Sequence, residues 1–376
     1  MATRRGHGEG SIYRAGDRWI ACIDLGWHNG RRVRKRVKSK TRKAASAALR
    51  RLQADAARGL AVVNDRRSVE EFLQQWLAEV VAPTTRPRTI GTYRSIVEQH
   101  LVPALGHIPL NRLRPAHVQR LVAAVVAAGK SPRTCEIIWS TLRRALKIAV
   151  RWGLVAVNPC DGVTPPRPRQ REVTVLSVEE IQRLLALATH AHHGVAFVLA
   201  LTTGMRRGEI AALKWSDIDL EAATLRVRAN LQRIGGSLVE GEPKSERSRR
   251  TIRLSQVTFK ALQAHRVRQA EARLRAGERW QDVGYVVSTD LGGPVDPRNL
   301  LRDWYALLDA AGIERRPLHV ARHSAASLML SRGVPLKTVQ ETLGHSTARL
   351  TIDLYGHLMP GDDHRAAEAM DAALAT

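Results

Sequence analysis

The chain has 376 residues, which exceeds a usual single domain and predicts two or three domains, each with its own core. Its 60 lysines and arginines against 35 aspartates and glutamates give a net charge of +25 and an isoelectric point near 11.2. This excess is larger than solubility requires, so nucleic acid is the expected partner. A basic membrane-surface protein is the competing interpretation, but its charge would form one terminal tract, whereas here it is spread along the chain.

The cysteines and the apolar stretches indicate a cytoplasmic protein. Cys22, Cys135 and Cys160 are far apart and lack CxxC spacing, which is typical of reduced thiols. The first residues are followed by no apolar signal region, and no stretch reaches the ~18 apolar residues of a membrane-spanning helix. We therefore expect no membrane association.

The first sixty residues hold 16 of the basic side chains and only 4 acidic ones. Residues 18–25 have the composition of a strand, His28-Asn29-Gly30 provides a turn, and residues 32–37 predict a second strand. Thr41 is a candidate cap for a helix that runs toward Gly59. We expect residues 1–62 to form a domain with a three-stranded sheet and one packing helix.

Four basic residues of the second strand share one face, because side chains alternate with a period of two. They are Arg32, Arg34, Arg36 and Lys38. An ordinary solvated strand face is the alternative, but like charges side by side repel one another unless an anion lies over them. Since a two-stranded ribbon fits the major groove, we expect these four side chains to contact DNA.

The middle of the chain predicts a helical bundle over residues 66–166. A capping box, Ser68-Val69-Glu70-Glu71, precedes an amphipathic pattern, and further helices are expected over 89–101, over 114–128 and from Ser131 to Trp152. Each basic side chain on these helices fits an ordinary solvated face as well as it fits DNA contact, and only the whole set favours DNA contact. A proline-rich segment over 158–169 then indicates a linker, with a domain boundary near 166–172.

Residues 172–376 predict a third domain that is mostly helical. A second capping box, Ser177-Val178-Glu179-Glu180, precedes a helix expected over 178–188. Further helices are expected over 194–203 and 206–213, then after Ser255, at Asp296-Pro297, and around His319, Pro335 and Thr347. Residues 225–227, 237–239 and 250–254 predict one small antiparallel sheet. The expected fold class is therefore multidomain and mainly α, with small antiparallel β elements.

Three segments of this domain carry residues that suit attack on a phosphodiester. They are Thr203-Gly204-Met205-Arg206-Arg207-Gly208-Glu209, His319-Val320-Ala321-Arg322-His323, and Leu343-Gly344-His345 followed by Tyr355-Gly356-His357. Paired guanidiniums stabilise the negative charge that develops on phosphoryl oxygens, and a tyrosine attacks if its proton is removed as the bond forms. This chemistry requires no metal and no cofactor, and we expect neither.

These segments resemble the catalytic boxes of the tyrosine recombinases, the phage integrase family. The resemblance implies that Arg206 and Arg322 clamp the phosphate, with Glu209 in a structural supporting role. It also implies that His319 transfers a proton, that His345 bonds the phosphate and that Tyr355 attacks it. Val320 and Ala321 differ from the residues that are common inside the second box. The difference affects local packing and leaves both functional side chains in place. Residues 1–62 resemble the arm-type DNA-binding domain of some integrases, and 66–166 their core-binding domain.

The family also places a catalytic lysine in a β-turn between the first two boxes, where it protonates the leaving oxygen. Lys244 lies just before a predicted strand and resembles that element. Two other lysines fall between the boxes: Lys214 is interpreted as a surface residue, and Lys260 lies inside a predicted helix. We therefore assign the role to Lys244.

Metal binding is the alternative for two groups of histidines. His319 and His323 have the spacing of a helical zinc pair, but no glutamate follows His319, a third ligand is missing, and Arg322 would repel a cation. A second cluster, His190, His192 and His193, is interpreted as a helix end.

The expected function is site-specific recombination of DNA through a 3′-phosphotyrosyl intermediate, which integrates and excises a mobile element. Because each active site cuts one strand, a homotetramer on DNA is expected, and family analogy adds a DNA-bending protein and an excision factor. The tail over 362–376 is predicted either to dock on a neighbouring subunit or to pack on its own domain. A type IB topoisomerase and a catalytically silent DNA-binding regulator are the alternatives.

Overall fold

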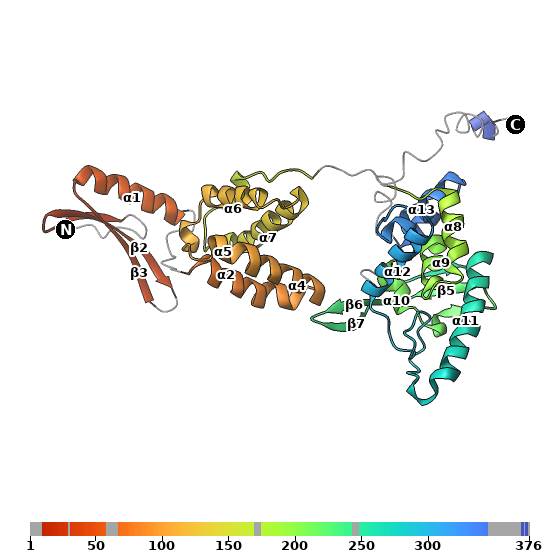
Figure 1. Ribbon diagram of the computed structural model, residues 1–376. Coiled ribbons are helices and arrows are strands. Elements are labelled where there is room, and N and C mark those ends of the chain that lie inside the picture. The colour runs from red at the N-terminus through yellow and green to blue at the C-terminus, as the bar shows by residue number, and fades with distance from the viewer. Residues whose placement is uncertain are drawn as a thin grey trace. The chain divides into compact units, whose positions relative to one another are not determined.

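The computed structural model describes residues 10–28, 31–57, 67–168, 174–242, 248–344 and the tail positions 370, 371, 373 and 374. The chain divides into two compact units, Met1–Gln170 and Arg171–Thr376. The predicted fold class is confirmed, because helices predominate and the strands form small antiparallel sheets (Figure 1). Across the described residues, no helix combines the length and apolar character needed to cross a membrane. All three cysteines are free thiols.

The N-terminal elements form an antiparallel sheet in the order β1-β2-β3, with one helix packed on it. The elements are β1 (Ser11–Ala15), β2 (Arg18–His28), β3 (Arg31–Ser39) and α1 (Arg42–Ala57). The Thr41 hydroxyl accepts the backbone N–H of Ala44 at 3.2 Å and so caps α1, as predicted. Ala21 and Ile23 of β2 are fully buried on the face that α1 covers. The other face of the sheet carries the alternate residues of β3.

Residues 67–168 form a helical bundle with its own apolar core. Its elements are α2 (Val69–Trp76), η1 (Leu77–Val81), α3 (Ala82–Thr84), α4 (Pro87–Ile96), η2 (Val97–Leu101), α5 (Val102–Leu105), η3 (Leu110–Arg112), α6 (Pro115–Ala127), α7 (Pro132–Arg151) and η4 (Pro159–Gly162). The predicted capping box begins α2: Ser68 Oγ accepts the Glu71 N–H at 3.1 Å, and Glu71 Oε2 accepts the Ser68 N–H at 2.7 Å. Ser131 likewise caps α7.

The second unit is helical around a short sheet and a separate hairpin. Its helices are α8 (Val178–Ala188), α9 (Gly194–Thr203), α10 (Arg207–Ala212), η5 (Trp215–Asp217), α11 (Gln256–Ala276), η7 (Gly277–Arg279), α12 (Pro297–Ala310), α13 (His319–Ser331) and α14 (Leu336–Leu343). Its strands are β4 (Ile218–Asp219), β5 (Thr224–Val227), β6 (Asn230–Ile234), β7 (Ser237–Gly241) and β8 (Arg250–Arg253). The helix predicted around Thr347 lies outside the described residues.

The prediction of one sheet in this unit was wrong. β5 pairs with β4 and β8, whereas β7 pairs with β6 in a hairpin of its own. The cause is the turn at Gly235 and Gly236: both have positive φ, which glycine adopts without strain, so the chain reverses within two residues. β6 has no clean alternation of apolar and polar residues, and its pattern alone did not identify it as a strand.

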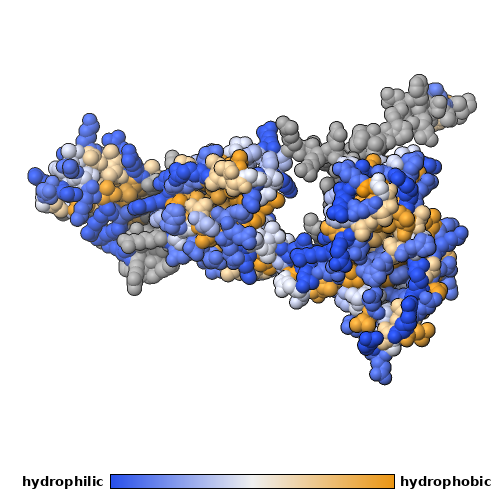
Figure 2. Space-filling view, viewed as in Figure 1, coloured by the Kyte–Doolittle hydropathy of each residue, from blue (hydrophilic) through white to orange (hydrophobic). Residues whose placement is uncertain are grey.

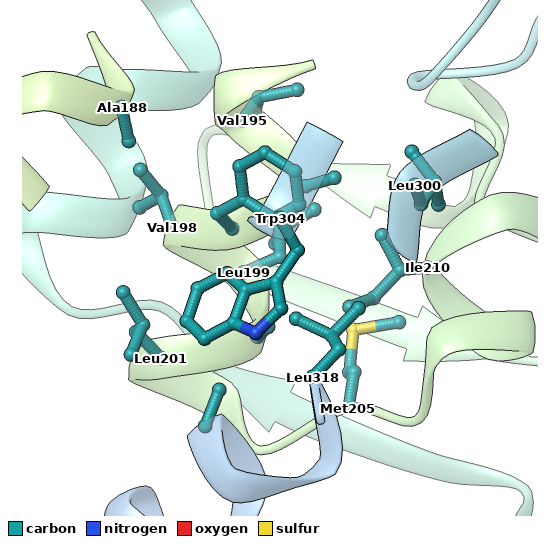
Figure 3. Close-up of a cluster of buried hydrophobic side chains, with 14 of the residues drawn as sticks. Ala188, Val195, Val198, Leu199, Leu201, Met205, Ile210, Leu300, Trp304 and Leu318 are labelled. Carbon is teal, nitrogen blue, oxygen red and sulfur yellow. The ribbon is translucent and has the colours of Figure 1, made fainter. Parts of the chain in front are cut away.

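The core of this unit gathers around Trp304 of α12 (Figure 3). The helix α9 contributes most of its residues to this core and is buried on nearly every side. Met205 and Leu318 belong to the same core and are 2% and 6% exposed. They directly precede Arg206 and His319, so the core fixes the backbone at two predicted catalytic positions.

Candidate active site

Arg206 lies at the junction of two helices. α9 ends at Thr203, and its C-cap residue Gly204 has a left-handed φ of 65°. Arg206 is the N-cap residue of α10. Glu209, in the first turn of α10, accepts the Arg206 backbone N–H at 2.9 Å and the Arg206 Nη1 at 2.7 Å. One buried carboxylate therefore fixes both the backbone and the guanidinium of Arg206, whose side chain is 38% exposed.

Arg322 projects from the first turn of α13 and is 2% exposed. Its Nη1 donates to the carbonyl of Gly204 at 2.6 Å, and its Nη2 donates to the carbonyl of Leu343 at 2.7 Å. Glycine at 204 is favoured because its φ of 65° strains other residues, and a Cβ there would lie 2.5 Å from Leu343 Cδ2, so the Leu343 side chain would have to move. Arg322 thus joins the ends of α9 and α14.

Three arginines hold the last carbonyls of α14. Arg250 Nε donates to the carbonyl of Thr342 at 2.6 Å, Arg322 to that of Leu343, and Arg206 Nη2 to that of Gly344 at 3.1 Å. Cations at a helix C-terminus are favourable because the last carbonyls carry partial negative charge. The structure therefore brings Arg206 and Arg322 together immediately before His345 in the chain.

His319 and His323 lie next to each other on α13, with ring centroids 4.7 Å apart in an edge-on arrangement. His319 is exposed at the protein surface, although many protein atoms lie near its ring. Burial, followed by the positive charges of His323, Arg322 and Arg206, lowers the pKa of His319 to about 4. Burial and Arg322 also lower the pKa of His323. Both rings are therefore neutral at physiological pH, and His319 lies within electrostatic reach of both arginines.

Three of the predicted catalytic residues, Lys244, His345 and Tyr355, lie outside the described residues. The other lysines between the boxes are described. Lys214 pairs with Glu240 at 3.0 Å and lies 5.2 Å from the ring centroid of Tyr285, so it is a paired residue at the hairpin instead of a simple surface residue. Lys260 is exposed on α11.

Arg250 is a residue of the site that the sequence pattern does not identify: it shares the Glu209 carboxylate with Arg206. Arg250 Nη2 donates to Glu209 Oε2 at 2.9 Å, and the two side chains are 6% and 3% exposed. Burial alone would raise the pKa of Glu209, but Arg250 and then Arg206 lower it below its usual value. Arg250 follows Lys244 in the same basic stretch, and only the fold reveals where its side chain lies.

The cluster of His192, His193 and Asp303 has ligand-type atoms within 4.8 Å of one another. His193 Nδ1 and Asp303 Oδ2 are 2.6 Å apart, which is a hydrogen bond, whereas two ligands of one zinc ion would be about 3.3 Å apart at bond lengths of ~2.0 Å. His192 also bonds Asp290 at 2.9 Å. The cluster is a hydrogen-bonded network at the start of α9.

All four basic residues of the predicted DNA-binding face of β3 are exposed, and two of them contact a carboxylate. Arg32 and Arg34 both contact the Asp24 carboxylate, at 2.7 and 3.3 Å. Arg36 and Lys38 are exposed on the same face. The visible surface of this N-terminal region is largely hydrophilic (Figure 2).

Comparison with known proteins identifies the family. A model of the phage integrase family matches residues 174–361, and a model of the phage integrase N-terminal SAM-like domain matches residues 68–125. A tyrosine recombinase XerC-like protein of Caldanaerobacter subterraneus subsp. tengcongensis is 33% identical, over 91% of this chain and 93% of the relative. An integrase of Streptomyces ambofaciens is 31% identical, over 94% of each chain.

Solved structures share the fold. The Tn1549 transposon integrase in complex with a circular intermediate DNA has a TM-score of 0.69 at 17% identity, covering 81% of this chain and 99% of that one. A lambda integrase dimer bound to a COC′ core site has a TM-score of 0.58 at 18% identity, covering 92% and 94%. The resemblance seen in the three sequence segments is confirmed: the chain belongs to the phage integrase family, the tyrosine recombinases.

Proposed function

We propose that this recombinase breaks and rejoins double-stranded DNA at specific sites, with Tyr355 as the nucleophile and a 3′-phosphotyrosyl intermediate. The observation that carries the assignment is the convergence of Arg206 and Arg322 on successive carbonyls at the end of α14, beside His319. The chain continues from this point to His345 and Tyr355. Two guanidiniums held at one place are suited to bind the non-bridging oxygens of a phosphodiester.

The two arginines act on the charge of the phosphate. Negative charge grows on the non-bridging oxygens as the tyrosine oxygen approaches phosphorus, and donors fixed in advance stabilise it without reorganisation. Arg206 is partly exposed and held by Glu209, so its guanidinium is accessible and oriented. Loss of one such donor typically lowers a rate about 100- to 1,000-fold.

Proton transfers complete the reaction. Neutral His319 accepts the phenolic proton as the Tyr355 oxygen bonds to phosphorus, and Lys244 gives a proton to the departing 5′ oxygen. His345 donates a hydrogen bond to the phosphate. The phosphotyrosyl bond keeps the energy of the broken phosphodiester, so the 5′ hydroxyl of a second strand can reverse the reaction and reseal the DNA.

The remaining modules supply DNA contacts and assembly. Residues 66–166 would bind the core site and residues 1–62 the arm-type site through Arg32, Arg34, Arg36 and Lys38. Relatives include the ICEBs1 integrase and the integrase of Mycobacterium phage L5, which supports integration and excision of a mobile element. A tetramer on DNA, a DNA-bending protein and an excision factor complete the proposal.

The test uses a duplex that spans the junction of the circularised element and carries a nick beside the cleavage site, which traps the covalent intermediate. Wild-type protein should form an adduct that withstands denaturation. Tyr355→Phe should form none, whereas Tyr305→Phe, a change in a half-buried tyrosine of α12, should behave as wild type.

Three results would contradict this proposal. An adduct with Tyr355→Phe would assign the attack to another residue. No adduct with wild type would favour a silent DNA-binding regulator. Relaxation of supercoiled DNA without exchange between two junction sites would favour a topoisomerase.

A further inference from the structure

We propose that Arg250 is a positioning residue for the cleavage reaction: it orients Arg206 through Glu209 and fixes the end of α14 through Thr342. The inference rests on the proposed function of Arg206. It assigns Arg250 no contact with DNA. Its effect on the phosphate passes through the two residues that it holds.

The contacts of Arg250 use all three nitrogens of its guanidinium. Nε donates to the Thr342 carbonyl at 2.6 Å, Nη1 to the Ser248 carbonyl at 3.1 Å and Nη2 to Glu209 Oε2 at 2.9 Å. The side chain is 6% exposed, so these acceptors, and not water, define its position. A planar fork with fixed donors suits this task, and a lysine ammonium does not.

Glu209 transmits the effect to Arg206. Its carboxylate is buried between the two arginines, and Arg250 contributes more than Arg206 to keeping it ionised. Without Arg250, Glu209 would lose its main counter-ion and draw on Arg206 alone. Arg206 Nη1 already donates to Glu209. A stronger attraction between the Glu209 carboxylate and the Arg206 guanidinium would turn that guanidinium away from the phosphate.

Thr342 transmits the effect to the last catalytic segment. Its carbonyl lies one residue before the carbonyl that Arg322 holds and two before the one that Arg206 holds. Arg250 therefore fixes the last turn of α14, from which the chain runs to His345. Displacements of about 1 Å at a reacting centre cost about 100-fold in rate.

The test measures single-turnover adduct formation on the nicked duplex with Arg250→Met, Arg250→Lys and the control Arg253→Met, an exposed arginine of the same strand. Arg250→Met should lower the rate constant about 100-fold while leaving the affinity for the duplex unchanged. Arg250→Lys should fall between Arg250→Met and wild type, and Arg253→Met should match wild type.

A purely structural role predicts a different result. Partial unfolding would lower the amplitude of adduct formation and leave the rate constant of the folded fraction unchanged, which would overturn the inference. If Arg250→Met does not fold, Arg250→Lys decides the matter, because a folded Arg250→Lys with the wild-type rate constant would also overturn it.

A double-mutant comparison isolates the route through Arg206. Adding Arg250→Met to Arg206→Lys should cost much less than it costs in wild type, because the residue through which it acts is already altered. Independent, multiplying losses would refute positioning through Arg206. Absence of any adduct with wild type would instead refute the proposed function, so the two failures are distinguishable.

Discussion

Glu209 binds Arg206 at two points: Oε1 accepts the guanidinium at 2.7 Å, and Oε2 accepts the backbone N–H at 2.9 Å. Glu209 therefore stabilises the first turn of α10 and orients a side chain that is proposed to be catalytic. The two residues are three positions apart, so this contact is local in the sequence, like a capping box.

The change Glu209→Gln tests this relationship. The amide keeps the shape but removes the charge that balances Arg250 and Arg206, so the free energy of unfolding should fall by about 3 kcal/mol. Adduct formation should slow in parallel, because Arg206 loses its anchor. Urea unfolding and the nicked-duplex assay measure the two effects. Glu271→Gln, in an exposed residue of α11, is the control, and equal behaviour of the two variants would contradict the role of Glu209.

The two arginines that are proposed to clamp the phosphate should not tolerate replacement by lysine. Arg206→Lys and Arg322→Lys each keep the charge but lose the pair of donors, so adduct formation should fall about 100- to 1,000-fold. Arg322→Lys should also lower stability by about 1–3 kcal/mol, because its two carbonyl acceptors are buried with it. Arg332→Lys, at the exposed C-terminal end of α13, should change neither the rate of adduct formation nor the stability. A wild-type rate in either clamp variant would remove that arginine from the mechanism.

Local signals predicted much of the fold. The capping boxes at Ser68 and Ser177 and the cap at Ser131 mark where helices begin, because each depends on residues only three positions apart. The pairing of strands was less predictable, since β6 and β7 form a hairpin instead of joining β5. Strand propensity depends on neighbours that the pattern does not contain.

The residues of the candidate site and the supporting role of Glu209 were predictable from the resemblance to the family's boxes, whereas the role of Arg250 was not. Order and spacing identified Arg206, His319 and Arg322 as a set, and the structure brings these three together. The role of Arg250 was not predicted because its partners Glu209 and Thr342 lie 41 and 92 positions away in the chain. Contacts between residues so far apart in the chain depend on the packed fold, and the periodicity of the sequence does not predict them.

The proton-accepting state of His319 predicts a distinct pH dependence. Burial, then His323, Arg322 and Arg206, lowers its pKa to about 4, so the ring should not titrate between pH 5 and 8 in the DNA-free protein. Binding of the DNA phosphate should raise that pKa, because an anion favours the imidazolium. NMR titration of labelled histidines, with His319→Gln for assignment, measures both. A DNA-free midpoint near 6.5 would contradict the lowered pKa of His319.

The same shift has a consequence for stability. Because the folded-state pKa of His319 is depressed, the unfolded chain binds more protons between pH 4 and about 6.5, and stability should fall as the pH drops through this window. His319→Gln should flatten this part of the profile of unfolding free energy against pH. An unchanged slope in the variant would assign the acid sensitivity to other groups.

The N-terminal sheet predicts a gain of affinity on loss of a carboxylate. All four predicted DNA contacts are exposed, but Asp24 forms ion pairs with two of them, Arg32 and Arg34, and so competes with a DNA phosphate for their guanidiniums. Asp24→Asn in the full chain should therefore bind duplex DNA more tightly, with a salt dependence steeper by about one or two phosphate contacts. The matched control is Asp309→Asn, which removes the same charge from an exposed ion pair with Arg315. Fluorescence anisotropy across a salt series measures both, and equal effects would show that only net charge matters, against a DNA-binding face on β3.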